Sequence, residues 1–487
     1  MRVFEELQAE LRTALAANVP GSRIEHVVVA MPSYSLGETL LAHYGQRVPA
    51  LEHRYVVVMG MLQRVPGCEL VFIGSQHPGP DVIEYYLSLL PPQHRADVRS
   101  RFHVVTLTDL SPRSVAQKLV EDDRALAEIA RVRRNRLAFL EPWHVTEHEV
   151  RAAVALQMPV NGTDPALRPL AYKSAGRRLF RTAGVPFPVG YEDVCSVDDV
   201  VAAADRIKGE KPSCTAVVVK HDDSGAGDGN VVLDLSADLR AQLTALPEWY
   251  LRDLAAGAVV EERIIGLEFT SPSAQVDLLP DGRVVLLATH EQELGGPDGQ
   301  VYTGCRFPAR AEYAAEVGRH ALSVADKLVE QGAIGRISVD FAAARDEGGW
   351  SLYALEVNLR KGGTTHPYSV LRNFAPGRYD RDSGRWVTLS GEVRCYRATD
   401  NLVDRDWLGV SPSAAVDAVG RQGLHFDFVS GTGVVLHMLS CLAIDGRFGL
   451  TAIGRDADHA SQLYDATERA MRNHVPSSGA APGATRG

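Results

Sequence analysis

The chain has 487 residues, more than one hydrophobic core normally holds, and this length predicts two to four domains. Apolar residues make up 45% and charged residues 23%, as in globular proteins, and the net charge of −10 offers no basic footprint for nucleic acid or an anionic membrane. No run approaches eighteen apolar residues, no signal-peptide core opens the chain and no cysteines form a CxxC pair, so we expect a cytoplasmic protein that binds neither nucleic acid nor membrane.

The first third of the chain is punctuated by short β-branched runs that predict strands. These runs are His26–Ala30, Tyr55–Met59, Leu70–Ile73 and His103–Leu107. Continuous apolar strands suit a parallel sheet that is buried on both faces. We therefore predict an open α/β domain over residues 1–165. It carries no GxGxxG fingerprint, so we do not expect it to bind a dinucleotide.

A second unit is predicted over residues 166–378. Lys173–Ala183 has the pattern of a helix, and Gly184 ends it. A long amphipathic helix is predicted at Arg310–Gln331. Strands are predicted at Thr215–Lys220, Asn230–Leu233, Ala258–Ile264 and Arg283–Glu291 in one sheet, with an antiparallel hairpin of Ile337–Ala342 and Ser351–Val357.

The C-terminal part is predicted to be a small α/β lobe over residues 390–472, ending in the helix Ala457–Arg472. A charged, turn-rich connection at Tyr379–Arg385 precedes it. Residues 473–487 are low in complexity and predict a flexible tail. The fold class is therefore α/β (α+β), with no internal repeat.

Two lysines and a glycine loop are candidates for holding phosphates. Lys173 starts a helix and Lys220 ends a strand, just before a loop that contains Ser224, Gly225, Gly227 and Gly229. Alternating glycines let backbone N–H groups approach a phosphate closely. The loop lies between two strands, so it is neither a Walker A nor a Rossmann loop. Read alone, each lysine fits a solvated helix start or strand end, and the loop fits a solvated hairpin turn.

The segment Val259–Thr270 offers backbone groups that suit an adenine edge. Glu268, beyond the strand, is a carboxylate able to accept hydrogen bonds from both ribose hydroxyls. Taken by itself, the segment is equally consistent with an ordinary strand that turns its acids to solvent.

The strongest candidates are Asp340, Glu356 and Asn358. Glu356 and Asn358 lie two apart on one predicted strand, so they share a face, and Asp340 on the preceding strand can lie opposite them. Two carboxylates and an amide oxygen are hard oxygen ligands that suit Mg²⁺ shared with substrate phosphates. Arg360 follows, able to grip a phosphate or carboxylate with two hydrogen bonds. The amides of Gly362 and Gly363 are candidates to hold a developing oxyanion.

The order of these motifs from Lys173 to His366 resembles the ATP-grasp domain: lysine, lysine, glycine loop, EE-x-I-x-G-x-E, D and E-x-N-x-R. About 200 residues carry the resemblance, and the region before residue 165 resembles the domain that precedes it in that superfamily. Within the superfamily the chain is most similar to the peptide ligase of pheganomycin-type antibiotic pathways. The segments Glu356–Pro367, Gly304–Pro308 and Gly433–Ser440 carry that likeness.

The resemblance implies a role for each matched residue. Nucleotide contacts are implied for Lys173 and Lys220 on the phosphates, for Glu261, Glu262 and Ile264 on the adenine, and for Glu268 on the ribose. Asp340, Glu356 and Asn358 are implied to hold two magnesium ions, with Arg360 near the transferred phosphoryl group. D-alanine–D-alanine ligases often have an arginine where this chain has Ser338, and Arg306 and Arg336 are the alternatives for the oxyanion.

The implied reaction uses ATP and Mg²⁺ to activate a carboxylate as an acyl phosphate. An amine, which the resemblance implies to be that of a peptide, then attacks the acyl phosphate to form an amide. Alternatives remain open from the sequence. One is another ATP-grasp outcome, a carboxylate–thiol ligase or a small-molecule kinase, and the other is a nucleotide-binding scaffold without turnover. The identity of the acid and the amine is also open, as is the oligomeric state, for which a homodimer is one candidate.

Overall fold

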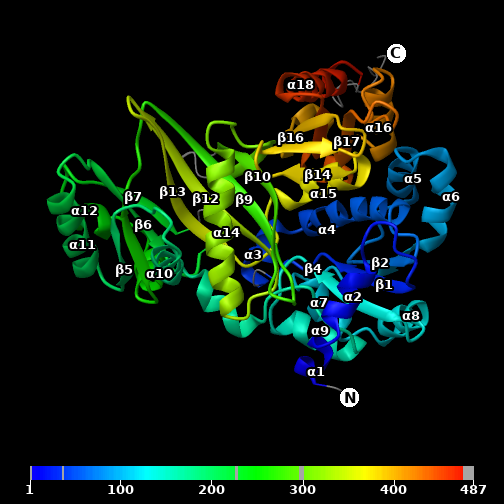
Figure 1. Cartoon of the computed structure of the whole chain (residues 1–487), viewed down its shortest axis with the longest axis horizontal. Helices are drawn as coiled ribbons and strands as arrows, with labels where there is room; N and C mark the ends of the chain where they lie inside the picture. Colours follow the sequence, from blue (N-terminus) through cyan, green and yellow to red (C-terminus); the bar gives the residue numbers. More distant parts are fainter. Residues whose placement is uncertain (1–2, 36–37, 225–228, 296–300, 475–487) are drawn as a thin grey trace, which may run out of the picture.

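Three β-sheets organise the chain in the computed structural model, which describes residues 3–35, 38–224, 229–295 and 301–474 (Figure 1). The fold is a mixed α/β fold, as predicted. The described part of the chain contains no helix that is both long and apolar enough to cross a membrane. The predicted domain boundaries stay predictions. The strands of the last two predicted units share one sheet.

The first sheet is parallel, with strand order β3-β2-β1-β4. Its strands are β1 (His26–Met31), β2 (Cys68–Gly74), β3 (Phe102–Thr106) and β4 (Leu137–Pro142). The surrounding helices are α1 (Phe4–Gln8), α2 (Leu11–Ala17), α3 (Glu38–Tyr44), α4 (Arg47–His53), α5 (Pro80–Ser88), α6 (Pro92–Arg101), α7 (Val115–Leu119), α8 (Asp123–Arg133) and α9 (Glu147–Leu156). Three of the predicted strands are confirmed, and β4 was missed.

The predicted strand Tyr55–Met59 is wrong. These residues lie within the 3-10 helix η1 (Arg54–Gln63), which continues directly from α4. The run is buried on several sides, with Val56, Val57 and Met59 all inaccessible to solvent. A short apolar run that is buried all round has no period that separates a strand from a helical segment, so the β-branched composition misled the prediction.

The second sheet is antiparallel, with strand order β5-β8-β6-β7, and it forms the left part of Figure 1. Its strands are β5 (Gly190–Val194), β6 (Ala216–His221), β7 (Asn230–Asp234) and β8 (Ala258–Glu262). The accompanying helices are η2 (Pro165–Ala171), α10 (Lys173–Ala183), α11 (Val197–Glu210), α12 (Leu239–Thr244) and α13 (Glu248–Leu254). The helix predicted at Lys173–Ala183 is confirmed at both ends.

The third sheet has ten strands and runs through the centre of the molecule. Its strands are β9 (Glu268–Leu278), β10 (Val284–Gly295), β11 (Val301–Phe307), β12 (Gly335–Asp346), β13 (Gly349–Asn358), β14 (Gly377–Asp380), β15 (Arg385–Thr388), β16 (Val393–Val403), β17 (Gly433–His437) and β18 (Arg447–Gly454). The predicted hairpin is confirmed as β12 and β13. The strand predicted at Arg283–Glu291 exists as β10, but it pairs with β9 and β11 and does not continue the sheet of β6 and β8.

Helices pack against both faces of this large sheet. The helix predicted at Arg310–Gln331 is α14 (Ala314–Glu330), and α15 (Thr365–Phe374) lies on the opposite face (Figure 1). The C-terminal segment adds η3 (Arg405–Trp407), α16 (Pro412–Gly420), η4 (Leu439–Cys441), α17 (Leu442–Asp445) and α18 (Ala457–His474). Its strand β16 pairs with β11, so the predicted lobe extends the central sheet and has no sheet of its own.

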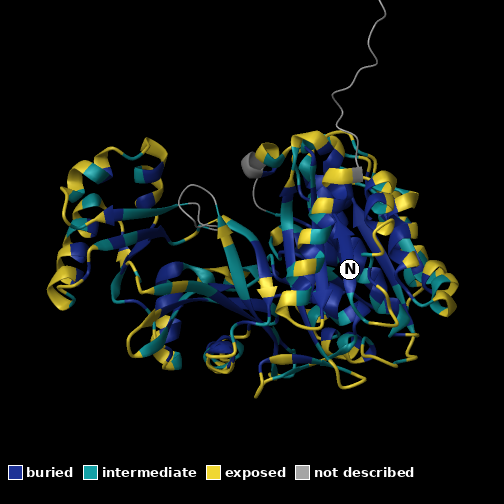
Figure 2. Ribbon diagram, turned by 90° about the horizontal axis from the view of Figure 1, so that it is seen from above, coloured by how far each residue is buried: buried dark blue, intermediate teal, exposed yellow. Residues whose placement is uncertain are grey.

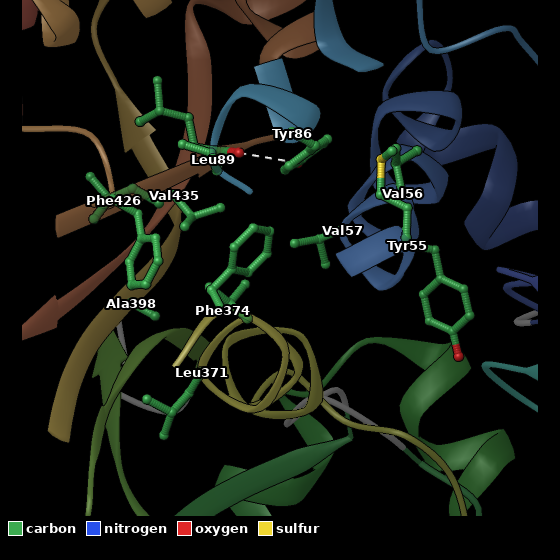
Figure 3. Close-up of a cluster of buried hydrophobic side chains, with 14 of the residues drawn as sticks. Tyr55, Val56, Val57, Tyr86, Leu89, Leu371, Phe374, Ala398, Phe426 and Val435 are labelled. Carbon is green, nitrogen blue, oxygen red and sulfur yellow. Dashed lines mark hydrogen bonds between the residues drawn. The ribbon is translucent and has the colours of Figure 1, made fainter. Parts of the chain in front are cut away.

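One hydrophobic core joins the first and last parts of the chain. Figure 3 shows Val57 of η1 near Phe374 of α15 and Val435 of β17, in a single buried cluster. Each such side chain contributes roughly 1.5–3 kcal/mol when it is fully buried. In contrast, the helices around the second sheet (β5-β8-β6-β7) turn a largely exposed surface outward (Figure 2). The central sheet therefore shares a hydrophobic core with the first part of the chain, and the second sheet projects from the molecule.

Candidate active site

The predicted phosphate and metal residues meet where the second sheet (β5-β8-β6-β7) joins the hairpin of β12 and β13. Lys173, the first residue of α10, is buried. Its Nζ donates to Oε1 of Glu356 at 2.9 Å and to the carbonyl oxygen of Ser224 at 2.7 Å. One lysine therefore bridges the end of β13 and the loop that follows β6, which places two of the predicted motifs in direct contact.

Two carboxylates converge on the central sheet. Asp340 of β12 pairs directly with Glu356 of β13, as predicted from the two-residue period. Removal of water around Asp340 and the nearby charge of Glu356 raise the pKa of Asp340 to about 6, against the opposing effects of Ser273, Arg360 and Lys173. Two neighbouring carboxylates repel each other when both are ionised, and a bound cation would offset this repulsion.

The donor set around this pair fits a hard divalent ion. Asn358 Nδ2 donates to Asp340 Oδ2 at 3.0 Å, and Gln292 Nε2 donates to Asp340 Oδ1 at 3.0 Å. Half a turn of the Asn358 amide would present its oxygen instead. In the described part of the chain no three His, Cys, Asp or Glu side chains gather as a metal site, so an ion here would rely on two carboxylates, an amide oxygen and oxygens of its ligand. Mg²⁺ tolerates that sharing.

A second buried carboxylate, Glu261 of β8, lies between two cations. Lys220 Nζ donates to its Oε2 and Arg177 Nη1 to its Oε1, each at 2.5 Å. Burial alone raises the pKa of Glu261, but Lys220 and Arg177 outweigh it and hold the pKa below its ordinary value. Arg177 also donates through Nε to Glu192 at 3.0 Å. Sequence reasoning missed Arg177, although it lies four residues after Lys173 on the same helix face.

The glycine loop is described only at its ends. Ser224 supplies the carbonyl oxygen that Lys173 contacts, whereas Gly225 and Gly227 lie outside the described residues. Gly229 has φ +86°, and a Cβ there would come within 3.0 Å of His221 Nδ1. A side chain at Gly229 would therefore be strained and crowded, which explains glycine at this end of the loop.

The predicted adenine segment is partly engaged within the protein. The backbone N–H of Glu262 donates to Val189 O at 2.8 Å, and the Glu262 side chain accepts from Val189 N at 3.0 Å. Arg263 N donates to Ala216 O at 2.9 Å. Beyond them, Ile264 is half-buried and Ile265 is 62% exposed at the connection between two sheets. The segment therefore offers the apolar side chains of Ile264 and Ile265 rather than free N–H groups at Glu262 and Arg263.

Glu268 is not brought to this cluster. It lies five residues before Ser273 on β9, and Ser273 faces Asp340, so the alternation of a strand turns Glu268 to the other face. There its carboxylate contacts Arg310 at 2.6 Å and Arg345 at 3.5 Å. This geometry gives no support to the predicted ribose contact.

Arg306 is also directed away. Gln292 and Glu293 are neighbours on β10 and point to opposite faces; the first reaches Asp340, and the second accepts from Arg306 Nε at 2.7 Å. Arg306 also donates to Ser461 of α18 at 3.2 Å. The other alternative, Arg336, forms two hydrogen bonds with Asp277 and is engaged there. With these partners, neither arginine is directed to the place of the arginine that Ser338 replaces.

Arg360 and the glycine pair lie at the edge of the cluster. The charge of Arg360 acts on Asp340 and lowers its pKa against the effects of burial and Glu356. Gly362 N donates to Thr365 Oγ1 at 3.1 Å, so this amide is already engaged. A Cβ at Gly363 would lie 2.6 Å from the Tyr302 ring, so only glycine fits here. Of the predicted oxyanion groups, Arg360 is the one whose charge acts on Asp340.

Gln292 and Ser273 were not predicted. Both hold Asp340 from strands β10 and β9, which lie 48 and 67 residues before it in the chain. No local pattern marks either residue, and only the order of strands in the sheet brings them together.

Comparison with known proteins gives a sequence match along most of the chain. The L-propargylglycine–L-glutamate ligase of Streptantibioticus cattleyicolor is 30% identical over 455 residues, which cover 89% of this chain and 92% of that protein. Residues 414–467 match the family described as the PGM1 C-terminal domain. That match includes most of α16 and most of α18, outside the cluster around Asp340.

Solved structures share the fold at much lower identity. A biotin carboxylase from Campylobacter jejuni, solved with an ATP analogue, is 12% identical, with a TM-score of 0.57 over 91% of this chain and 90% of that one. An N5-carboxyaminoimidazole synthetase from Staphylococcus aureus is 13% identical, with a TM-score of 0.51 over 93% of this chain and 100% of that one. The overall fold is thus shared over more than nine tenths of the chain.

Proposed function

The chain belongs to the ATP-grasp ligases, and from this premise we propose that it joins an amino-acid-like carboxylate to the amino group of an amino acid or peptide at the cluster around Asp340. It is an ATP-dependent carboxylate–amine ligase that forms a peptide bond. The observation that carries the site assignment is the contact of Lys173 with Glu356 beside Asp340, since it joins the proposed phosphate and metal groups in one place.

The reaction has two steps. A carboxylate oxygen attacks the γ-phosphorus of ATP, the bond to ADP breaks, and an acyl phosphate forms. The acceptor amine then attacks the carbonyl carbon, loses a proton and displaces inorganic phosphate, leaving the amide. Phosphoryl transfer needs mainly positioning and charge neutralisation.

The chain's own residues provide that positioning. Lys173 and Lys220 hold phosphate oxygens, and for this each exchanges a carboxylate partner, Glu356 or Glu261, for the nucleotide. Arg360 orients the transferred phosphoryl group or the carboxylate, and the Gly363 amide donates to the developing oxyanion. When bound to Asp340, Glu356 and Asn358, Mg²⁺ neutralises phosphate charge.

The substrates follow from the relative's name at the level of class. That relative is named for joining L-propargylglycine to L-glutamate, so we assign this chain an amino-acid donor and an amino-acid or peptide acceptor. We also propose a place in the cytoplasm, where ATP is available, and in natural-product assembly of the antibiotic type.

The test is a screen of the purified protein with ATP and Mg²⁺ against pairs of amino acids and short peptides, followed by ADP release and product mass. We expect ADP release that requires both substrates, together with a mass equal to their sum less one water. A thioester formed with a thiol acceptor, or a phosphorylated product without an amide, would replace the proposed reaction with the corresponding alternative. No ADP release with any substrate would favour a binding scaffold.

A further inference from the structure

A cavity of about 470 Å³ lies between the first sheet and the central sheet, lined by α2, η1, the turn between β9 and β10, the start of β12 and α15. Its lining contains six basic and three acidic side chains. These are Arg12, Arg64, Arg283, Arg336, Lys361 and Arg372, with Glu141, Asp277 and Asp281. The whole chain carries a net charge of −10, so a basic cavity runs against the overall balance.

Half of the basic groups are already neutralised. Arg336 donates to Asp277 at 2.8 and 3.0 Å, and Arg283 contacts Asp281 at 2.9 Å. Lys361 Nζ contacts Glu141 at 2.7 Å. Each acid of the lining therefore pairs directly with one cation, and the charges of Arg372 and Arg12 reach Asp277 and Asp281 only at longer range. Three guanidinium groups have no acid of the described lining as a direct partner.

Those three, Arg12, Arg64 and Arg372, form no ion pair within 4 Å among the residues that the structure describes. Arg64, directly after η1, and Arg372 of α15 both line the cavity, and Arg64 Nη1 donates to the carbonyl oxygen of Arg372 at 2.5 Å. Burial and the like charge of Arg372 lower the pKa of Arg64. Two like charges that are half-buried in the same cavity repel each other.

Three of the basic side chains also act electrostatically on the same residue, Tyr368. The hydroxyl of buried Tyr368 lies within the electrostatic reach of Arg372, Arg336 and Arg64. The guanidinium of Arg336 lies 5.6 Å from the centre of the Tyr368 ring. Three of the six basic groups, Arg64, Arg336 and Arg372, therefore lie around the same buried side chain.

We propose that this cavity binds a small polyanion with at least two negative charges on phosphate or carboxylate groups, gripped by Arg64 and Arg372 with Arg12 at the rim. A guanidinium fork binds either group with two parallel hydrogen bonds. The cavity volume is that of a small-molecule site. A dianion would replace the repulsion between Arg64 and Arg372 with two attractions.

The site is separate from the cluster around Asp340. Arg336 precedes Asp340 by four residues on β12, roughly 13 Å along the strand. Between them, Gln275 of β9 donates to Thr364 Oγ1 at 2.9 Å and accepts from Thr365 Oγ1 at 3.2 Å, which closes the path across the sheet. A ligand in the cavity would instead connect η1 of the first sheet to α15 on the central sheet.

The experiment measures binding and thermal unfolding of the full chain, with no use of the ligation assay, so its outcome is independent of the proposed function. The probes are inorganic phosphate and citrate, with sodium chloride at matched ionic strength as the reference. We expect one or both probes to raise the unfolding midpoint above the chloride reference, because a ligand of the native state stabilises it. Phosphate alone assigns a phosphate ligand, and citrate alone a polycarboxylate.

Three variants locate the effect. Arg372→Gln removes one of the two like charges of the cavity and should weaken the affinity about tenfold or more, with an unliganded midpoint equal to or above that of the parent. Arg64→Lys keeps the charge but loses the fork, and should weaken binding less. Arg283→Gln removes the same charge from the exposed, Asp281-paired position and should change the affinity less than twofold. Equal responses of parent and Arg372→Gln, or no response beyond chloride, would overturn the proposal.

Discussion

The two buried carboxylates of the candidate site, Glu261 and Asp340, differ in how the protein treats their charge. Glu261 lies between Lys220 and Arg177, and the two cations hold its pKa below the ordinary value although burial acts the other way. Asp340 lies beside Glu356, and burial together with that second acid raises its pKa to about 6. One carboxylate is neutralised within the fold, whereas the other retains a surplus of negative charge.

The difference indicates which carboxylate takes a cation from solution. A buried carboxylate with two cations gains nothing from a metal ion and serves to hold the lysine in place. Of the facing acids only Glu356 has a direct cation partner among the described residues, namely Lys173, so Asp340 gains a favourable interaction when a second cation arrives. Asp340 is therefore expected to control chemistry, and Glu261 to control the position of Lys220.

The largest effect is expected from Asp340→Asn, which removes one acid of the facing pair. Amide formation should fall on the order of a thousandfold, because the cation that neutralises the phosphate charge loses a ligand. The unfolding midpoint without nucleotide should stay equal or rise, since the repulsion with Glu356 disappears. Steady-state kinetics and thermal unfolding measure the two effects on the same preparation.

The matched control is Asp346→Asn, the same chemical change at the exposed end of the same strand. Its activity should remain within about twofold of the parent, as for surface substitutions away from special features. Full activity of a folded Asp340→Asn variant would remove the metal site from this position.

A smaller effect is expected from Lys220→Met, which leaves Glu261 with Arg177 alone. The KM for ATP should rise by about ten- to a hundredfold, because a phosphate loses a point charge. Stability should also fall, since a buried carboxylate loses a partner. The double variant Lys220→Met/Glu261→Gln should recover stability without recovering the KM. Recovery of both would show that Lys220 acts on the fold alone.

Much of this site could be predicted because its signals are local. The two-residue period of β12 and β13 placed Asp340 opposite Glu356, and the helix that starts at Lys173 has clear boundary signals. The stretch Tyr55–Met59 failed because burial on several sides erases the period on which the strand prediction relied.

Other features depend on contacts between distant segments. Gln292 reaches Asp340 only through the order of β10, β9 and β12 in the central sheet, which no spacing in the chain reveals. Glu268 matched a family motif, yet its place on the alternate face of β9 turns it toward Arg310. A motif thus predicts residue types along the chain, and the pleat decides which of them share a site.

Glu52 has a raised pKa, as Asp340 has, but no second acid beside it among the described residues. It is fully buried, burial raises its pKa to about 7, and its contacts are Ser75 N at 2.6 Å and Ser75 Oγ at 2.9 Å, without a second acid. The folded protein therefore binds a proton here that the unfolded chain, with a pKa near 4.5, has lost. Between these values the native state binds more protons, so stability should fall as pH rises from about 4.5 to 7.

Glu52→Gln should remove that part of the pH dependence, up to roughly 3 kcal/mol in the free energy of unfolding. Urea unfolding at pH 5 and pH 7 measures the difference between the parent and the variant. Ligation kinetics at pH 7 should change little, because Glu52 contacts neither Asp340 nor Glu356. Identical pH slopes for both proteins would place the pKa of Glu52 near its ordinary value.

The smallest effect is expected from Arg306→Gln. Arg306 is half exposed, and its partner Glu293 keeps Arg397 at 3.3 Å when Arg306 is removed, so stability should change by less than about 1 kcal/mol. The rate of ligation should change by less than about twofold, since Glu293 and Gln292 point to opposite faces of β10. Arg360→Gln, on the side of Asp340, should lower the rate far more. A loss with Arg306→Gln as large as with Asp340→Asn would mean that Arg306 leaves Glu293 during the reaction, and the site would then include both faces of the sheet.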